Sequence, residues 1–142
     1  MISTSHLHPM LVHFPIALLV FGFIADAASI FFKKELCLSR LGFYLLMVGT
    51  LAALAALLTG TLFTSEMSGA AGAVKDTHEL FAWITLGTAV VTSSFRLFIK
   101  IKNLETSNLK WVALTLYALV AVSVSITGFY GGTLVYNYMM PL

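Results

Sequence analysis

The stretch that decides the fold is residues 9–32, PMLVHFPIALLVFGFIADAASIFF. With histidine counted as neutral, Asp26 is the only charged side chain in this stretch. As an α-helix rising 1.5 Å per residue it is about 36 Å long, which exceeds the roughly 30 Å hydrocarbon core of a bilayer. The stretch is too long for the apolar core of a signal peptide, and no basic segment precedes it. We therefore predict a retained transmembrane helix.

Three further apolar stretches follow, at residues 41–63, 79–99 and 111–136. Of the 142 residues, 59% are hydrophobic and 10% are charged, and the mean hydropathy is +0.95. Soluble chains carry about 25% charged residues, so this composition favours a membrane protein. The predicted fold is all-α: an integral membrane four-helix up-down bundle that forms a single domain over residues 1–142.

Basic residues mark one side of the predicted bundle. Seven of the eight lysines and arginines lie in or beside the first and third connections, whereas the second connection holds only Lys75. The positive-inside rule then places both termini and the second connection outside, which is the periplasm if the bilayer is a bacterial inner membrane. No basic stripe is present, so no nucleic acid partner is expected. The seven residues are Lys33, Lys34, Arg40, Arg96, Lys100, Lys102 and Lys110.

The four histidines, His6, His8, His13 and His78, all fall at the predicted outer side. His6 and His8 precede Pro9 and are expected before the first helix. His13 lies about one turn inside that helix.

His78 begins the third helix, where Asp76 or Thr77 is a suitable cap. The first and third helices of an up-down bundle run parallel, so His13 and His78 are expected at similar depth, facing each other. Two such imidazoles form a bis-histidine pocket for haem b. With His8 as a third ligand, the same residues form a metal site. The alternative is a structural role, with histidines bonded to backbone carbonyls.

Other residues at the outer side extend this prediction. Gly128, Gly131 and Gly132 are expected to let the last helix approach the cofactor closely, and Tyr136 is a candidate contact. Four methionines also fall there, and thioether with imidazole suits copper, which gives a second candidate ligand. These methionines are Met10, Met67, Met139 and Met140.

Helix faces predict how the bundle packs. One stripe of the second helix carries only small residues, which allow close helix approach in lipid. These are Gly42, Gly49, Ala53, Ala56 and Gly60. Asp26 is an intramembrane acid: either a functional group or the partner of Arg40, Arg96 or Lys100 in an ion pair.

The stretch HPMLVHFPIALLVFGFIAD resembles the opening signature of a bacterial membrane family known as domain of unknown function 2231. The segments LAALAALLTGTLF, DTHELFAW and GFYGGTLVYNY extend the resemblance over nearly the whole chain. It implies a four-helix integral membrane protein. Some relatives look fused to domains similar to c-type cytochromes, which implies redox work.

The leading functional hypothesis is therefore a haem b-binding electron-transfer module at the periplasmic face. It would pass electrons between a membrane quinol and a periplasmic cytochrome or a larger respiratory complex. The alternatives are a membrane protein that handles copper or another metal, and a structural or assembly subunit of a larger membrane complex. No nucleophile–base pair or phosphate-binding loop is visible, so no catalytic residue is predicted.

Overall fold

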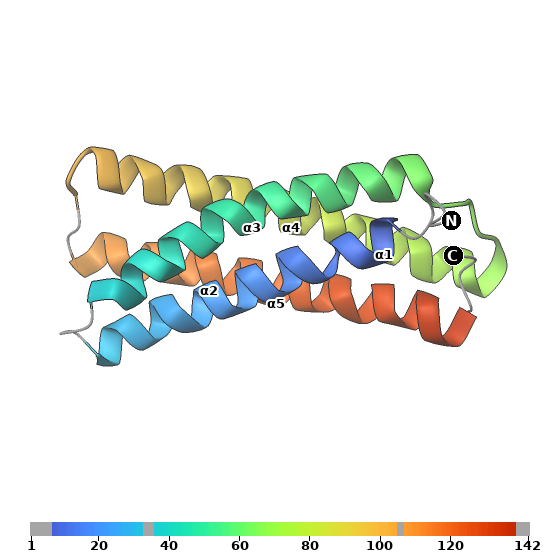
Figure 1. Cartoon of the computed structure of the whole chain (residues 1–142), viewed down its shortest axis with the longest axis horizontal. Coiled ribbons are helices and arrows are strands. Elements are labelled where there is room, and N and C mark those ends of the chain that lie inside the picture. Colours follow the sequence, from blue (N-terminus) through green and yellow to red (C-terminus); the bar gives the residue numbers. More distant parts are fainter. Residues whose placement is uncertain (1–6, 33–35, 105–106, 139–142) are drawn as a thin grey trace.

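The computed structural model describes residues 7–32, 36–104 and 107–138, and its elements are all helices (Figure 1). They are α1 (Leu7–Leu11), α2 (His13–Phe31), α3 (Leu36–Phe63), α4 (Gly69–Ile101) and α5 (Ser107–Tyr138). Four spans are long and apolar enough to cross a membrane. The predicted all-α transmembrane bundle is confirmed. Five residues named above, His6, Lys33, Lys34, Met139 and Met140, lie outside the described residues.

The first span starts earlier than predicted, because α1 and α2 are almost continuous. The Val12 amide donates to the carbonyl of His8 at 3.1 Å, which carries the helical bonding across the junction. Pro9 lies in the first turn of α1, where a backbone N–H has no helical acceptor, so the proline is tolerated. The prediction that His8 precedes the helix is therefore wrong: His8 belongs to α1.

Helix α4 begins at Gly69 rather than near residue 79. The polar segment that was expected to be a loop stays helical, because the buried Lys75 ammonium lies 3.3 Å from both Glu66 and Glu79. Asp76 and Thr77 consequently lie inside α4, and the prediction that one of them caps the helix is wrong.

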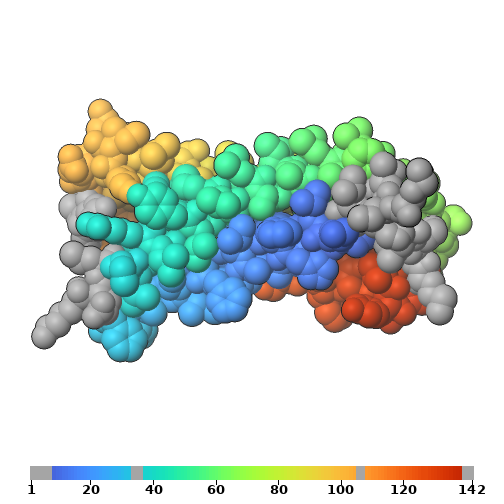
Figure 2. Space-filling view, in the orientation of Figure 1, coloured from blue at the N-terminus to red at the C-terminus, as the bar shows by residue number. Residues whose placement is uncertain are grey.

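The bundle consists of two tightly packed helical hairpins. In the first hairpin α1 and α2 pack on α3, and in the second α4 packs on α5. Between the hairpins, α2 contacts α5 and α3 contacts α4 more sparsely, and α2 lies diagonal to α4. Figure 2 shows α1 and α2 lying between α3 and α5. We call the surface where the two hairpins meet the seam.

The middle of the seam is closed by a buried apolar cluster. Its members come from α2, α3, α4 and α5, and burying them stabilises the association of the hairpins through close packing. They are Leu19, Leu46, Ala89, Tyr117, Val120 and Val124.

The end of the bundle that holds Arg96 and Lys100, here called the basic end, is joined across the seam by polar bonds. Arg96 of α4 pairs with the buried Asp26 of α2, which confirms one of the three predicted partners. Two neutral bonds also cross between the hairpins: Thr50 with Ser93 at 2.9 Å, and the Tyr117 hydroxyl with the Gly42 carbonyl at 3.3 Å.

The small-residue stripe of α3 packs closely, as predicted. A Cβ added to Gly42 would lie 2.8 Å from the Cβ of Asp26, and one added to Gly49 would lie 2.7 Å from Leu19. Only glycine permits this separation between α2 and α3.

Candidate functional site

The opposite end of the bundle, here called the histidine end, contains a cavity of about 250 Å³ in the seam. Its walls come from all five helices and consist mainly of apolar and small residues. The ionisable groups that line it are His8, His13, Lys75, His78, Glu79 and Tyr136. The volume is close to the lower end of the range for small-molecule sites, about 300–1,000 Å³.

His8 is fixed against α3 within the first hairpin. Its Nδ1 lies 2.9 Å from the carbonyl oxygen of Ala56 and 3.3 Å from the hydroxyl of Thr59. The ring lies directly over Gly60, where an added Cβ would come within 2.9 Å of the His8 Cε1. The glycine therefore provides the space in which this imidazole sits.

His78 is fixed in the same way within the second hairpin. Its Nδ1 lies 2.9 Å from the carbonyl oxygen of Thr127 on α5. The ring lies over Gly131, where an added Cβ would be 3.1 Å from the His78 Cε1.

Both sites share one local arrangement: the carbonyl that holds the imidazole is four residues before the glycine. A helical side chain leans toward the N-terminus and covers the preceding turn. A glycine leaves that turn uncovered, so the carbonyl of Ala56 or Thr127 can accept a further hydrogen bond from outside its helix. The Ala56–Gly60 and Thr127–Gly131 pairs are thus matched seats for His8 and His78.

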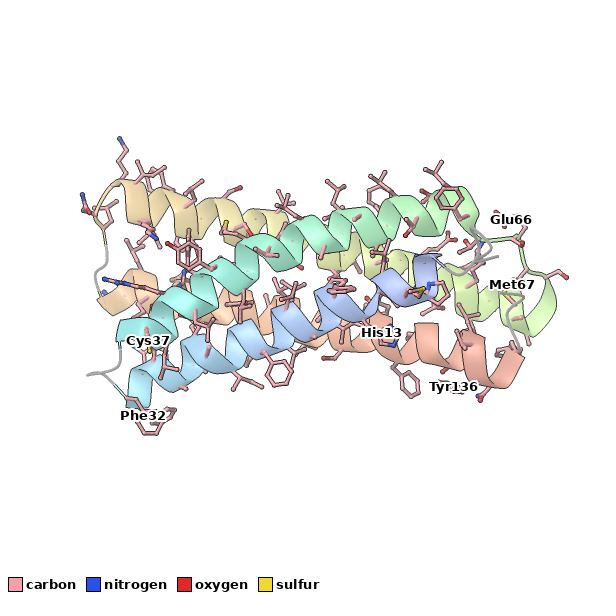
Figure 3. The ribbon with its side chains drawn as sticks, in the orientation of Figure 1. His13, Phe32, Cys37, Glu66, Met67 and Tyr136 are labelled. Atoms are coloured by element: carbon pink, nitrogen blue, oxygen red, sulfur yellow. The ribbon has the colours of Figure 1, made fainter. Side chains whose placement is uncertain are left out.

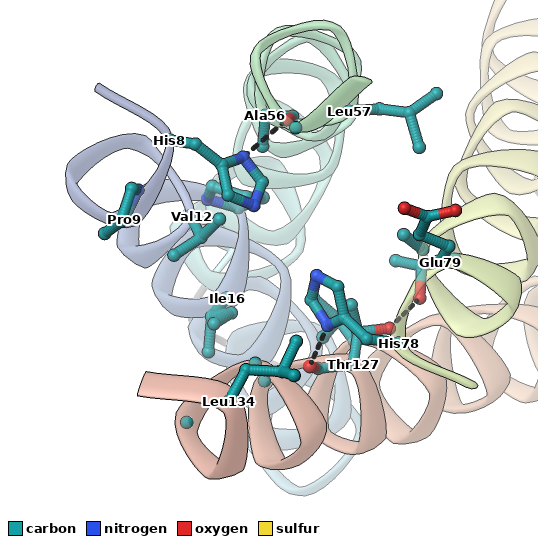
Figure 4. Close-up of a pocket in the computed structure, with 18 of the residues that line it drawn as sticks. His8, Pro9, Val12, Ile16, Ala56, Leu57, His78, Glu79, Thr127 and Leu134 are labelled. Atoms are coloured by element: carbon teal, nitrogen blue, oxygen red, sulfur yellow. Dashed lines mark hydrogen bonds between the residues drawn. The ribbon is translucent and has the colours of Figure 1, made fainter. Parts of the chain in front are cut away.

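The two seated imidazoles face each other across the seam. Figure 4 shows His8 and His78 pointing toward one another into the cavity. Their ring centroids are 6.3 Å apart and their planes are inclined by 79°. A carbonyl only accepts, so each Nδ1 is the protonated nitrogen, and each Nε2 keeps a free lone pair, the state in which histidine binds metals.

His13 has a different environment from the one predicted. Its Nδ1 lies 2.8 Å from the carbonyl oxygen of Pro9, and its ring is exposed. The face of α2 that is buried is the other one, which includes Pro15, Gly22 and Asp26. His13 still borders the cavity, but the imidazole in contact with His78 is that of His8.

The three predicted glycines have three separate environments. Gly131 seats His78, and an added Cβ at Gly128 would lie 3.0 Å from Ile16 of α2. An added Cβ at Gly132 would meet nothing within 4 Å, although Gly132 borders the cavity. Tyr136 also borders the cavity and is 84% exposed.

Several residues of the site were not predicted as such. Thr59, Gly60 and Thr127 act only through contacts with distant histidines, and a single sequence gives no signal of those pairings. The sequence predicts a loop at Lys75, yet its side chain is buried and borders the cavity.

The three histidines expected to form a metal site are not brought together, because His8 faces His78 whereas His13 is exposed. Within residues 7–32, 36–104 and 107–138, no group of three or more His, Cys, Asp or Glu side chains is arranged to hold a metal ion. The site formed by His8 and His78 therefore offers two protein ligands rather than three.

This architecture is that of a multi-pass membrane protein with a two-imidazole pocket between helical hairpins. Residues 4–141 match the family described as predicted membrane protein (DUF2231), and the chain belongs to that family. No curated protein and no solved structure matches the chain significantly.

Proposed function

We propose that the protein holds haem b in the seam, with His8 and His78 as the two axial ligands, and acts as a membrane redox module. The observation that carries the proposal is the opposed pair of imidazoles, each with Nδ1 bound to a carbonyl and with no hydrogen bond of Nε2 to the described residues. Haem iron accepts axial imidazoles from the two sides of the porphyrin plane.

The separation of the rings is consistent with this role. Each Nε2 lies about 1 Å from its ring centroid, and metal–imidazole bonds are about 2.0–2.1 Å long. Ligands on opposite sides of one ion therefore have centroids about 6 Å apart, whereas a tetrahedral angle brings them to about 5 Å. The observed 6.3 Å matches the opposed arrangement.

The distribution of hydrogen bonds favours a ligand between the hairpins. At the basic end and in the middle of the bundle, polar bonds cross the seam. At the histidine end, the bonds of His8 and His78 stay within their own hairpins. Each hairpin thus carries its imidazole as a preformed unit, and a metal group in the seam would join the two.

When bound, haem supplies reversible one-electron transfer. The chain's own contribution is to fix the two imidazoles through their Nδ1 bonds, which orient the rings and raise their basicity as ligands. With the histidine end outside a bacterial inner membrane, electrons would pass from a membrane quinol to a periplasmic cytochrome or larger respiratory complex.

The test is the absorption spectrum of detergent-purified protein, oxidised and reduced, after expression with haem supply. We expect a low-spin Soret band in the wild type. His8→Ala and His78→Ala should each lose or convert the band, because the iron loses one of its two protein ligands. His13→Ala is the matched control and should keep it. A wild type without a Soret band, or a His8→Ala protein with an unchanged spectrum, would contradict the proposal.

Copper is the second candidate ligand, because imidazole is a common ligand of copper and two facing imidazoles could coordinate one copper ion. Met10, which is 59% exposed, lies one turn or less from His8 and His13. Elemental analysis distinguishes this case, since it gives copper without a Soret band. If neither copper nor a Soret band is found, a structural or assembly role within a larger membrane complex remains.

A further inference from the structure

We propose that the seam is open to lipid between α2 and α5 at the histidine end, and that this opening binds the ring of a lipid-soluble quinol. The inference rests on the proposed redox function and deepens it by assigning the binding place and the residues of the electron donor. Its principal residues are His13, Gly132 and Tyr136, which we call the α2–α5 opening.

The register of the two helices places these residues together. Helices α2 and α5 are antiparallel, and Ile16 lies against Gly128. One turn toward the histidine end, α2 reaches His13 while α5 reaches Gly132. A further turn brings Pro9 opposite Tyr136. Figure 3 shows His13 and Tyr136 on neighbouring helices at this end.

The helices leave space beyond the contact of Ile16 with Gly128. A Cβ on Gly128 would be 3.0 Å from Ile16, but one on Gly132 would meet no atom of the described residues within 4 Å. His13 and Tyr136 border the same cavity as His8 and His78, yet both are exposed. They therefore stand where the cavity meets the outside of the bundle.

The surroundings determine what can reach this opening. It lies on membrane-spanning helices, so a ligand that arrives sideways must dissolve in lipid. The Nδ1–H of His13 donates to the Pro9 carbonyl, which leaves Nε2 as an oriented acceptor. A matching ligand carries a hydroxyl donor on a flat apolar ring, which is the chemistry of a hydroquinone. The Tyr136 ring supplies an aromatic surface and a hydroxyl beside it.

Two glycines make a matched test. Gly132→Leu would place a side chain in the opening, and Gly87→Leu is the control. An added Cβ meets no described atom within 4 Å at either position, but only Gly132 borders the cavity. The probe is a short-chain benzoquinol, added to protein in lipid nanodiscs. Binding is followed by quenching of Trp83, which borders the cavity, in a Trp111→Phe background.

We expect saturable quenching in the parent protein and in Gly87→Leu, and its loss in Gly132→Leu. His13→Leu should weaken binding roughly threefold to tenfold, since it removes one hydrogen bond of about 0.5–1.5 kcal/mol. His13→Gln, which retains an acceptor, should bind more tightly than His13→Leu. Equal quenching in Gly132→Leu and Gly87→Leu would overturn the inference.

The absorption spectra of the same preparations separate the two proposals. A Soret band without saturable quinol binding contradicts the α2–α5 opening and leaves the haem proposal standing. Saturable binding that Gly132→Leu abolishes, in protein without a Soret band, contradicts the haem proposal and supports the opening. Quenching that rises linearly with quinol in every variant shows lipid partitioning alone and also overturns the inference.

Discussion

Replacing Gly60 and Gly131 by alanine tests whether glycine is required at these positions to make room for the imidazoles of His8 and His78. An alanine in place of glycine within a helix gains about 0.5–1 kcal/mol of stability in the absence of steric conflict. At Gly132 an added Cβ meets nothing within 4 Å, so Gly132→Ala should show this gain.

At the two seats the gain is opposed by displacement of a ring. The added Cβ lies 2.9 Å from the His8 Cε1 at Gly60 and 3.1 Å from the His78 Cε1 at Gly131. Relief requires each ring to move away and lengthen its 2.9 Å bond to the carbonyl. Weakening one such bond costs about 0.5–1.5 kcal/mol. The net change for Gly60→Ala and Gly131→Ala should lie between a gain of about 0.5 kcal/mol and a loss of about 1 kcal/mol, in each case below the change at Gly132.

Equilibrium unfolding in detergent measures these differences. Gly60→Ala should be the least stable, followed by Gly131→Ala, with Gly132→Ala above the wild type by about 0.5–1 kcal/mol. The imidazole ¹⁵N resonances of His8 and His78 report whether Nδ1 keeps its hydrogen bond. If all three alanine variants gain equal stability and both resonances are unchanged, the seats are not steric requirements.

Three further outcomes are expected. Asp26→Asn or Arg96→Gln should each lower the free energy of unfolding by about 3–5 kcal/mol, because each leaves one buried charge without its partner. The double variant should lose clearly less than the sum of the two, since no charge is left unpaired, whereas additive losses would show that the pair does not interact. Gly22→Ala should destabilise the bundle because its Cβ collides with the Tyr117 hydroxyl. Adding Tyr117→Phe should restore part of the lost stability, whereas no restoration would mean that the added Cβ conflicts with Leu45 instead. Ligand occupancy of the two-imidazole pocket should fall in acid, because protonated imidazoles cannot bind a metal. Occupancy that does not change with pH would contradict histidine ligation.

Orientation in the bilayer is a separate prediction from the basic connections. Alkaline phosphatase fused after Leu142 should be active, because the enzyme matures only in the periplasm, while a fusion in the connection between α2 and α3 should be inactive. The reverse pattern would place the histidine end in the cytoplasm.

Much of the fold follows from local properties of the sequence. Four spans are visible because each needs only a long apolar run, and hydrophobicity is a property of the run itself. The small-residue stripe of α3 also follows from the sequence, as does an ion pair of Asp26 with one of the basic residues at its end of the bundle, among which the structure selects Arg96. Small residues mark close helix contacts in lipid, and a buried carboxylate needs a cation at its own depth.

The polar stretch before His78 could not be assigned correctly from local sequence. Its charges resemble those of a solvated loop, but Lys75 is neutralised by Glu79 one turn later and by Glu66 of the connection. The second partner is brought in only by the folded chain, and this pairing lets α4 start at Gly69.

The sequence by itself determined that histidines gather at one end of a membrane bundle. Only the tertiary structure decided which of them face each other. His8 and His13 are five residues apart, so on a continuous helix they point about 140° away from each other and only one can face the seam. The close packing of Gly22 and Asp26 against α3 fixes the rotation of α2, which directs His8 toward His78 and leaves His13 exposed at the edge of the cavity.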